Sequence, residues 1–392
     1  MRYGRDFLVH EGPFLRYPDL LRQPTRFATW PAGFAAGALA LVVALILWGM
    51  AASSPAVGPS GGPLTPGAVS ARTAKADPSG DDILLYRSIV AGIRNGGDYY
   101  TVTAPLLRDH HYPMRPFVTF RLPTLALMLA AMPDWLAIGL MAMLSAAVII
   151  AWTVRLSPAL RTPEISSWTS LVLLGGCLTA AGPMLLVFHE SWAALLIALA
   201  LALHRPAGTP GRWWPSVIAG LAAVMIRELA LPFILLMGAL ALYAHRWTEA
   251  AAWAMVTLLF LFALMLHAGQ VALVTLPGDP ASPGWTSLGG WPFLIDSVRA
   301  TTVLDYLPLA LTATLVPLSL LGWAAWRSAL GLATVLFLAG FACMMMLIGR
   351  PDNFYWAVMI EPLLLIGLVF TPAALRDLYR AAITSRRPLA RA

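Results

Sequence analysis

The chain has 392 residues, of which 59% are hydrophobic and only 11% are charged, against roughly a quarter charged in an ordinary soluble domain. This composition excludes a water-soluble globular protein, because apolar runs near the ~20 residues needed to cross a bilayer recur along the chain. The formal net charge of +7 does not indicate nucleic-acid binding, since basic residues in a membrane chain first set its orientation. Cys177 and Cys343 lie in apolar runs without C-x-x-C spacing, and they predict neither a disulfide framework nor a zinc site.

The apolar runs predict the membrane spans in chain order. The first run, about 31–52, follows a 30-residue segment with scattered arginines that is too long for a cleavable signal. We therefore predict a retained first span with a cytoplasmic amino end. Residues 53–79 are rich in Ala, Gly, Pro and Ser and predict a flexible connector on the far side. Further apolar segments lie at about 122–132, 135–154, 166–187, 191–204, 213–226, 229–244, 250–276, 303–324, 328–348 and 355–372.

The segment 117–132 decides the orientation of everything that follows it. It is interrupted by Arg121 and Pro123 and stopped by Pro133-Asp134, so we predict an interfacial or re-entrant helix and exclude it from the spans. The expected fold is then an all-α polytopic transmembrane helix bundle of about ten spans, with both termini cytoplasmic. This arrangement places 16 basic and six acidic residues on the cytoplasmic side and 10 basic and 13 acidic residues on the other, as the positive-inside tendency requires.

The first outer loop holds an acidic pair, Asp81-Asp82, at the start of a segment closed by Asn95-Gly96-Gly97. This pattern predicts a short helix with an acidic amino end and a glycine stop. We expect its apolar face to rest on the bilayer interface and the opposite face, with Arg87 and Arg94, to meet water. The pair can serve as a general base toward a substrate hydroxyl, and capping of a surface helix explains it equally well. The apolar positions are Ile83, Tyr86, Ile89, Val90 and Ile93.

The remainder of this loop is rich in arginine, tyrosine and histidine, which suits a lipid-borne phosphate. An interfacial belt of snorkelling arginines and anchoring tyrosines is the equal alternative. The adjacent His110 and His111 cannot point the same way on a regular element, so the dipeptide alone does not predict a metal site. The residues concerned are Asp98, Tyr99, Tyr100, Arg108, His110, His111, Tyr112, Arg115 and Arg121.

Charged residues also fall between short apolar segments at His189-Glu190 and Arg227-Glu228. Charges at such positions are costly unless they pair or face a wet cavity. We therefore expect water to reach mid-membrane depth there, and an ion pair of Arg227 with Glu228 or Glu190 is as good an interpretation as a ligand-binding role. In the carboxy-terminal half, interfacial anchoring is the favoured role for Trp285 and Trp291.

The order of these motifs resembles the multispan, lipid-linked-sugar-dependent glycosyltransferases of the GT-C fold, and the chain is similar to bacterial family-87-like members. The resemblance covers about residues 35–245, and no motif of the carboxy-terminal half matches. No nucleotide-binding P-loop, G-x-G-x-x-G, H-E-x-x-H or G-x-S-x-G motif is present in the sequence. The matching segments are Asp81-Asp82-Ile83-Leu84-Leu85-Tyr86, Gly96-Gly97-Asp98-Tyr99-Tyr100, Tyr112-Pro113-Met114-Arg115-Pro116, His189-Glu190-Ser191-Trp192 and Arg227-Glu228-Leu229-Ala230.

The resemblance implies transfer of a sugar from a polyprenyl-phosphate donor to an envelope glycan, lipid or protein acceptor at the outer face of the plasma (inner) membrane. It implies catalytic roles for Asp81, Asp82 and Glu190. It implies no nucleotide cofactor, and a divalent metal lacks support because no D-x-D accompanies Glu190. The donor phosphate is expected at Arg227, Arg115 and Arg121, and other substrate contacts at Tyr86, Asp98, Tyr99, His110, His111, His189, Glu228 and Arg350.

The resemblance also divides the chain. We predict a GT-C-like transmembrane module over 31–245 with its outer loop at 53–134, followed by carboxy-terminal transmembrane helices over 246–375. A cytoplasmic segment (1–30) and a basic cytoplasmic tail (376–392) flank them. Two other functional classes fit the same charges: a transporter or flippase of lipid-linked saccharides, and a non-catalytic membrane protein of envelope assembly.

Overall fold

The computed structural model describes residues 21–51, 78–180, 183–206, 211–282, 284 and 287–384. Within these ranges every regular element is a helix, and extended pairing is confined to two isolated β-bridges, which confirms the predicted all-α class. The α-helices are α1 (Ala32–Ala51), α3 (Pro78–Arg94), α4 (Tyr99–Asp109), α5 (Thr124–Ala130), α6 (Asp134–Leu156), α7 (Pro163–Ala180), α8 (His189–Leu203), α9 (Trp214–Ile226), α10 (Leu231–Tyr243), α11 (Trp247–Val274), α12 (Gly290–Thr301), α13 (Leu309–Ala325), α14 (Ala329–Ile348), α15 (Glu361–Leu364) and α16 (Thr371–Thr384). The 3-10 helices are η1 (Arg26–Thr29), η2 (Phe117–Thr119), η3 (Pro183–Val187), η4 (Glu228–Ala230), η5 (Val303–Tyr306), η6 (Pro351–Ile360) and η7 (Leu365–Val369).

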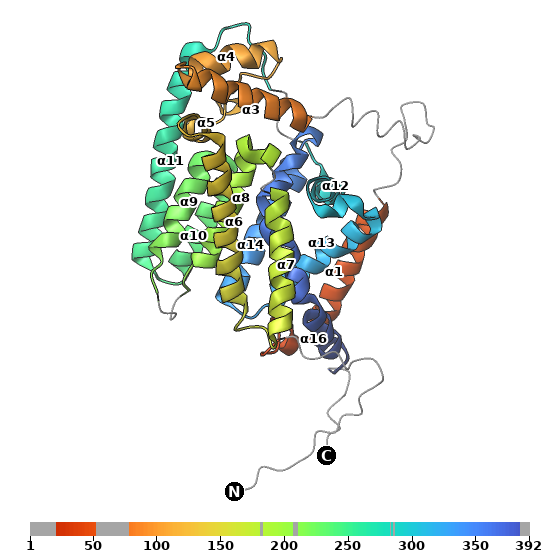
Figure 1. Ribbon diagram of the computed structural model, residues 1–392. Helices are drawn as coiled ribbons and strands as arrows, with labels where there is room; N and C mark the ends of the chain where they lie inside the picture. Colours follow the sequence, from red (N-terminus) through yellow and green to blue (C-terminus); the bar gives the residue numbers. More distant parts are fainter. Residues whose placement is uncertain are drawn as a thin grey trace, which may run out of the picture.

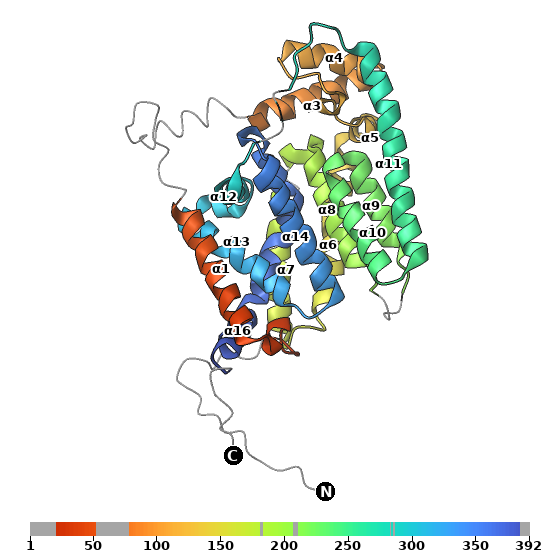
Figure 2. The same cartoon turned by 180° about the vertical axis from the view of Figure 1, so that it is seen from behind.

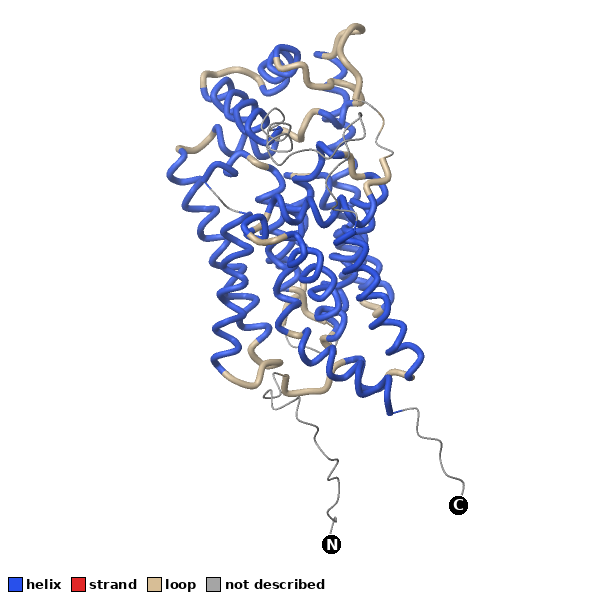
Figure 3. The backbone as a smooth tube through the Cα atoms, turned by 90° about the vertical axis from the view of Figure 1, so that its right-hand side faces the viewer, coloured by secondary structure: helices blue, strands red, loops and turns tan. Residues whose placement is uncertain are grey.

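The long helices run side by side and form one bundle (Figure 1; from behind in Figure 2). Helices α3 and α4 lie across one end of the bundle, and α16 lies at the opposite end beside the start of α1. The side view in Figure 3 shows helices throughout the bundle and no strand in its described part. The length of the apolar helices therefore separates the end with α3 and α4 from the end with α16.

Five helical segments are long and apolar enough to cross a membrane: α1, α6, α11, α14 and the continuous stretch Pro351–Val369. Other apolar helices, among them α8, α9, α10 and α13, have 13 to 17 residues. Where we predicted a helix that does not span, residues 117–132 form only η2 and the seven-residue α5. The composition and these helices support a membrane protein, while the number of ten spans stays a prediction.

The helix predicted after the acidic pair is α3, and Gly96 with φ +90° follows it as the predicted stop. Arg87 is exposed, as predicted, but the prediction that the apolar face rests on the bilayer interface was wrong. Leu85 and Ile89 are buried against protein, because α3 packs on α4 and α5. Arg94 donates to the carbonyls of Leu129 and Met132 and pairs with Asp134 at 2.6 Å. Helix α3 is therefore joined to the start of α6 by an ion pair and to the end of α5 by hydrogen bonds.

The second correction concerns the stretch between the predicted apolar segments 250–276 and 303–324, whose latter part forms α12. Trp291 does not anchor at an interface, since it is 3% exposed and its Nε1 donates to the Leu45 carbonyl of α1 at 2.9 Å. Trp285 lies outside the described residues. The segment predicted as a tail from 376 begins inside α16, where Asp377 accepts hydrogen bonds from the backbone and hydroxyl of Thr25. Residues 385–392 lie outside the described part.

Helix α13 and η7 approach so closely that only glycine fits between them. A Cβ atom on Gly322 would lie 1.8 Å from the Gly367 carbonyl oxygen, and one on Gly367 would lie 2.0 Å from the Ser319 carbonyl oxygen. Trp323 reinforces the contact by donating from Nε1 to the Leu363 carbonyl at 2.9 Å. This crossing fixes the segment that continues from η6, whose other end contributes to the candidate site.

We expect Gly322→Ala to destabilise the protein by about 1–3 kcal/mol, as over-packing of a filled interior does. Gly340→Ala on α14 is the matched control, because no atom lies within 4 Å of its added Cβ and alanine is the better helix former by ~1 kcal/mol. Thermal unfolding in detergent micelles measures both. Equal melting temperatures for the two variants would contradict the close contact.

Candidate functional site

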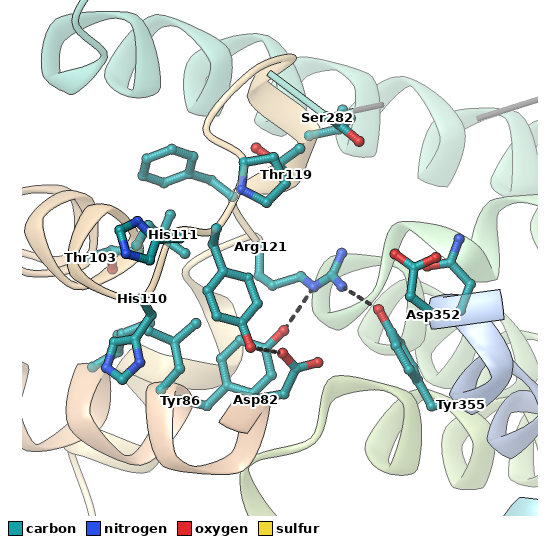
Figure 4. Close-up of a pocket in the computed structure, with 18 of the residues that line it drawn as sticks. Asp82, Tyr86, Thr103, His110, His111, Thr119, Arg121, Ser282, Asp352 and Tyr355 are labelled. Carbon is teal, nitrogen blue, oxygen red and sulfur yellow. Dashed lines mark hydrogen bonds between the residues drawn. The ribbon is translucent and has the colours of Figure 1, made fainter. Parts of the chain in front are cut away.

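A cavity of about 370 Å³ opens at the end of the bundle that carries α3 and α4. Its wall combines Asp82 and Tyr86 of α3, the connection 110–121, Arg227 from the α9–η4 junction, and the stretch 350–356. Figure 4 shows Asp82, Tyr86, Arg121 and Tyr355 converging on one space, with His110 and His111 on one side. Segments far apart in the sequence therefore contribute polar side chains to one cavity at the end of the bundle.

Among the described residues, Asp82 is one of the two carboxylate residues that line this cavity. Its side chain is 6% exposed, and the Tyr112 hydroxyl donates to Oδ1 (Figure 4). Burial raises the pKa of Asp82, and the hydrogen bond from Tyr112 and the charge of Arg121 partly oppose that shift. Asp82 is therefore a stronger base than an exposed aspartate once it is ionised, and it is positioned by a neighbouring hydroxyl.

Arg121 lies across the cavity and contacts three oxygens at hydrogen-bond distances that are all long. Its Nε lies 3.2 Å from the Tyr86 hydroxyl, and its two terminal nitrogens lie 3.3 Å from the Tyr355 hydroxyl and from Glu228 Oε1. The backbone of Arg121 is held more firmly, because the Tyr99 hydroxyl donates to its carbonyl at 2.6 Å. The fold thus places the guanidinium, whose ion-pair partner, Glu228, is shared with Arg227.

Arg227 forms the closest ion pairs of the site. It sits at the break between α9 and η4 with extended backbone angles and is 1% exposed. Its Nε lies 2.6 Å from Glu190 Oε1, and its Nη1 pairs with Glu228. Both ion pairs that the sequence suggested are therefore present. Glu190 is 1% exposed and does not line the cavity, so its predicted catalytic role stays a prediction.

Arg115 is directed at a neighbouring loop, and it does not line the cavity. Its guanidinium donates to the Asp279 carbonyl at 2.5 and 3.2 Å. Arg108 donates to both carboxylate oxygens of Asp279 at 2.7 and 2.9 Å, and the Ser282 amide donates to the Arg115 carbonyl at 2.6 Å. The loop after α11 is therefore bound to the loop after α4, and together they carry the side of the cavity formed by residues 110–121.

The other predicted site residues fall into two groups. Tyr86, Tyr99, His110, His111 and Arg350 line the cavity, with Arg350 paired to Asp352. The remainder lie beside or outside the cavity. Asp98 caps α4 by accepting from the amides of Tyr100 and Thr101, Glu228 contacts Arg121, and the His189 ring packs edge-on to Tyr86 at 5.0 Å. The side chain of Asp81 lies outside the described residues.

Tyr355 and Asp352 were not predicted as site residues, although both line the cavity. Their stretch, Arg350 to Trp356, is a polar interruption between apolar runs, and that interruption is the signal available in the sequence. Within the described residues no group of three or more His, Cys, Asp and Glu side chains could hold a metal ion. No protein family model, curated protein or solved structure matches the chain. The resemblance to GT-C enzymes therefore stays a prediction.

We expect the ion pair between Arg108 and Asp279 to stabilise the folded state above about pH 4, and this stabilisation to be lost as the pH falls. Hydrogen bonds from Arg108 hold the pKa of Asp279 at about 2, below its ordinary value of 3.8. A depressed pKa stabilises the folded state above the unfolded value and ceases to do so below the folded one. The difference in melting temperature between wild type and Asp279→Asn should therefore be constant above pH 5 and shrink toward pH 2. Asp305→Asn is the control, because Asp305 is exposed and lies 3.8 Å from Arg299, and it should show no such change.

Proposed function

We propose that the protein is a membrane glycosyltransferase that transfers a sugar from a polyprenyl-phosphate donor at this cavity. The observation that carries the proposal is a buried carboxylate, Asp82, and a cation, Arg121, whose side-chain contacts are all 3.2 Å or longer, on the wall of one cavity at the end of an apolar bundle. In this proposal the chain crosses the plasma membrane about ten times, both termini are cytoplasmic, and the cavity opens toward the outer face.

The reaction we infer is displacement at the anomeric carbon of the donor sugar. The acceptor hydroxyl oxygen forms the new bond to that carbon while the bond from the carbon to the phosphate oxygen breaks. The electron pair leaves with the lipid phosphate, and Asp82 takes the hydroxyl proton as general base. Negative charge grows on the departing phosphate, where a positioned cation stabilises the transition state more than the ground state.

Arg121 is the best-suited donor contact among the three predicted arginines. Its long contacts to two phenols and to Glu228 leave donor capacity for a phosphate, whereas Arg227 is engaged by two carboxylates and Arg115 by a backbone carbonyl. Arg227 then acts through Glu228, which it positions beside Arg121. The cavity of about 370 Å³ also falls within the ~300–1,000 Å³ typical of small-molecule sites.

We expect Asp82→Asn to lower the rate of sugar transfer by ~10²–10⁴-fold, the usual contribution of a general base, with intact donor binding. Asp98→Asn is the matched control, because an asparagine caps a helix as well as an aspartate does and Asp98 does not line the cavity. The assay incubates the purified protein with radiolabelled polyprenyl-phosphate hexoses and pentoses and with candidate acceptors. Transfer by Asp82→Asn at the wild-type rate would remove the base assignment.

The same donors distinguish transfer from transport. In proteoliposomes loaded on one side, an enzyme consumes the sugar donor and releases polyprenyl phosphate. A flippase would move the intact donor to the other leaflet. Movement of the donor across the membrane without its consumption would therefore overturn this proposal and identify the protein as a carrier.

The pH dependence of transfer tests the contact between Tyr112 and Asp82. The base must be ionised, so activity should fall as the pH drops through the raised pKa of Asp82. The hydrogen bond from Tyr112 favours the ionised form, and Tyr112→Phe should therefore move this acidic limb to higher pH. An acidic limb at the same pH in both proteins would mean that another group limits the reaction. Tyr243→Phe is the control, because Tyr243 is exposed and does not line the cavity, and it should leave the limb in place.

A further inference from the structure

One histidine interrupts the apolar run of helix α11. His267 is the only ionisable residue between Glu249 and Asp279 in the sequence, and α11 is one of the helices long enough to cross a membrane. The His267 side chain is 2% exposed. A buried polar side chain in such a helix is costly unless it is hydrogen-bonded, so its partners indicate what it does.

Both ring nitrogens of His267 have partners outside α11. The Nε2 atom lies 3.3 Å from the Phe120 carbonyl oxygen, and the Nδ1 atom lies 3.1 Å from the Tyr100 hydroxyl oxygen. A carbonyl oxygen only accepts, which assigns the proton to Nε2, and Nδ1 of the neutral ring then accepts from Tyr100. The rings of Tyr100 and Phe117 pack on the imidazole, with centroid distances of 5.6 and 6.3 Å. His267 therefore joins α4 to the residue that precedes Arg121.

Two consecutive tyrosines of α4 hold two consecutive carbonyl groups in this way. The Tyr99 hydroxyl donates directly to the Arg121 carbonyl at 2.6 Å, whereas Tyr100 reaches the Phe120 carbonyl through His267. Helix α11 packs against both α4 and η2, and Figure 1 shows the end of α11 beside α4. The two peptide groups that flank the Cα atom of Arg121 are thus both held from α4.

The position of the Arg121 guanidinium depends on these two peptide groups. Its own side-chain contacts, at 3.2 and 3.3 Å, are at the long end of the hydrogen-bond range, so the backbone has a large part in placing it. Neither His267 nor Tyr100 lines the cavity. They can therefore act on a ligand only through the segment that carries Arg121.

We propose that His267 is a positioning residue for Arg121 and that it acts through the Phe120 carbonyl. This inference rests on the proposed function, because it takes the Arg121 guanidinium as the contact for the lipid phosphate. Misplacing such a group by about 1 Å can cost ~10²-fold in rate. A residue that touches no ligand can thus limit both phosphate binding and transfer.

The test is a double-mutant cycle on the purified full-length protein, with calorimetry measuring the affinity for a short-chain polyprenyl phosphate. Arg121→Gln should weaken binding by ~10–100-fold, the usual contribution of a charge-assisted hydrogen bond. His267→Leu should weaken it by about tenfold in the wild-type background and should cost almost nothing more when Arg121→Gln is present, because it acts through that arginine. An equal loss in both backgrounds would overturn the proposal.

Two further variants separate positioning from packing. Phe260→Leu is the matched control, since Phe260 lies two turns earlier on α11 and is 1% exposed, and it should bind as wild type. His267→Gln supplies an amide donor for the Phe120 carbonyl and should restore most of the affinity. A loss in Phe260→Leu as large as in His267→Leu, or no recovery in His267→Gln, would contradict positioning. If His267→Leu does not fold, Tyr100→Phe takes its place in the cycle, because it removes only the hydroxyl that donates to Nδ1.

Transfer assays distinguish this inference from the proposed function. His267→Leu should lower kcat by ~10²-fold, and His267→Gln should recover most of that loss. If the wild type binds polyprenyl phosphate and transfers no sugar, the proposed function fails, and the affinity cycle still decides the role of His267. A wild type that does not bind polyprenyl phosphate would overturn both.

Discussion

The buried ion-pair cluster around Arg227 is the interaction on which the candidate site depends. Its guanidinium contacts Glu190 at the start of α8 and Glu228 at the start of η4. Removing one partner of such a pair would leave an uncompensated buried charge, at a cost of about 3–5 kcal/mol. The cluster therefore fixes where α8 begins and where α9 stops, and it aims Glu228 at Arg121. The cavity then has its cation in place before any ligand arrives.

Two short helices, α8 and α9, end at the charged residues Glu190 and Arg227 of this cluster. Helices α8 and α9 have 15 and 13 residues, which correspond to about 20–23 Å, less than the ~30 Å of a hydrocarbon core. In a bilayer, their polar ends, Glu190 and Arg227, would lie below the level that a helix of full spanning length reaches. Helices α3 and α4 and the connection 110–121 contribute to the wall of the cavity beside these residues. The short helices α8 and α9 and the segment of α3, α4 and residues 110–121 thus contribute to one site.

Local patterns predicted much of this fold, and long-range contacts account for the errors. Apolar runs located the helices, and Asp81-Asp82 with Gly96 located α3, because hydropathy and end signals are properties of neighbouring residues. The same patterns could not show that the apolar face of α3 meets α4 and α5 instead of lipid, since both surroundings favour the same side chains. They could not direct Arg115 to the Asp279 carbonyl or Trp291 to Leu45, because those partners are 164 and 246 residues away. Tyr355 was missed as a site residue for the same reason, since it is 234 residues from Arg121, which it contacts.

The contrast between Arg121 and Arg227 shows how one site can hold its charges for two purposes. Arg227 contacts two carboxylates and is almost wholly buried, so its ion pairs stabilise the fold. Arg121 has a firmly held backbone but long side-chain contacts, two of them to uncharged phenols. A cation in a fixed position, with donors that a ligand can take over, stabilises developing negative charge without reorganising its surroundings. The ion pairs of Arg227 support that arrangement, because they hold Glu228 in place and Glu228 also contacts Arg121.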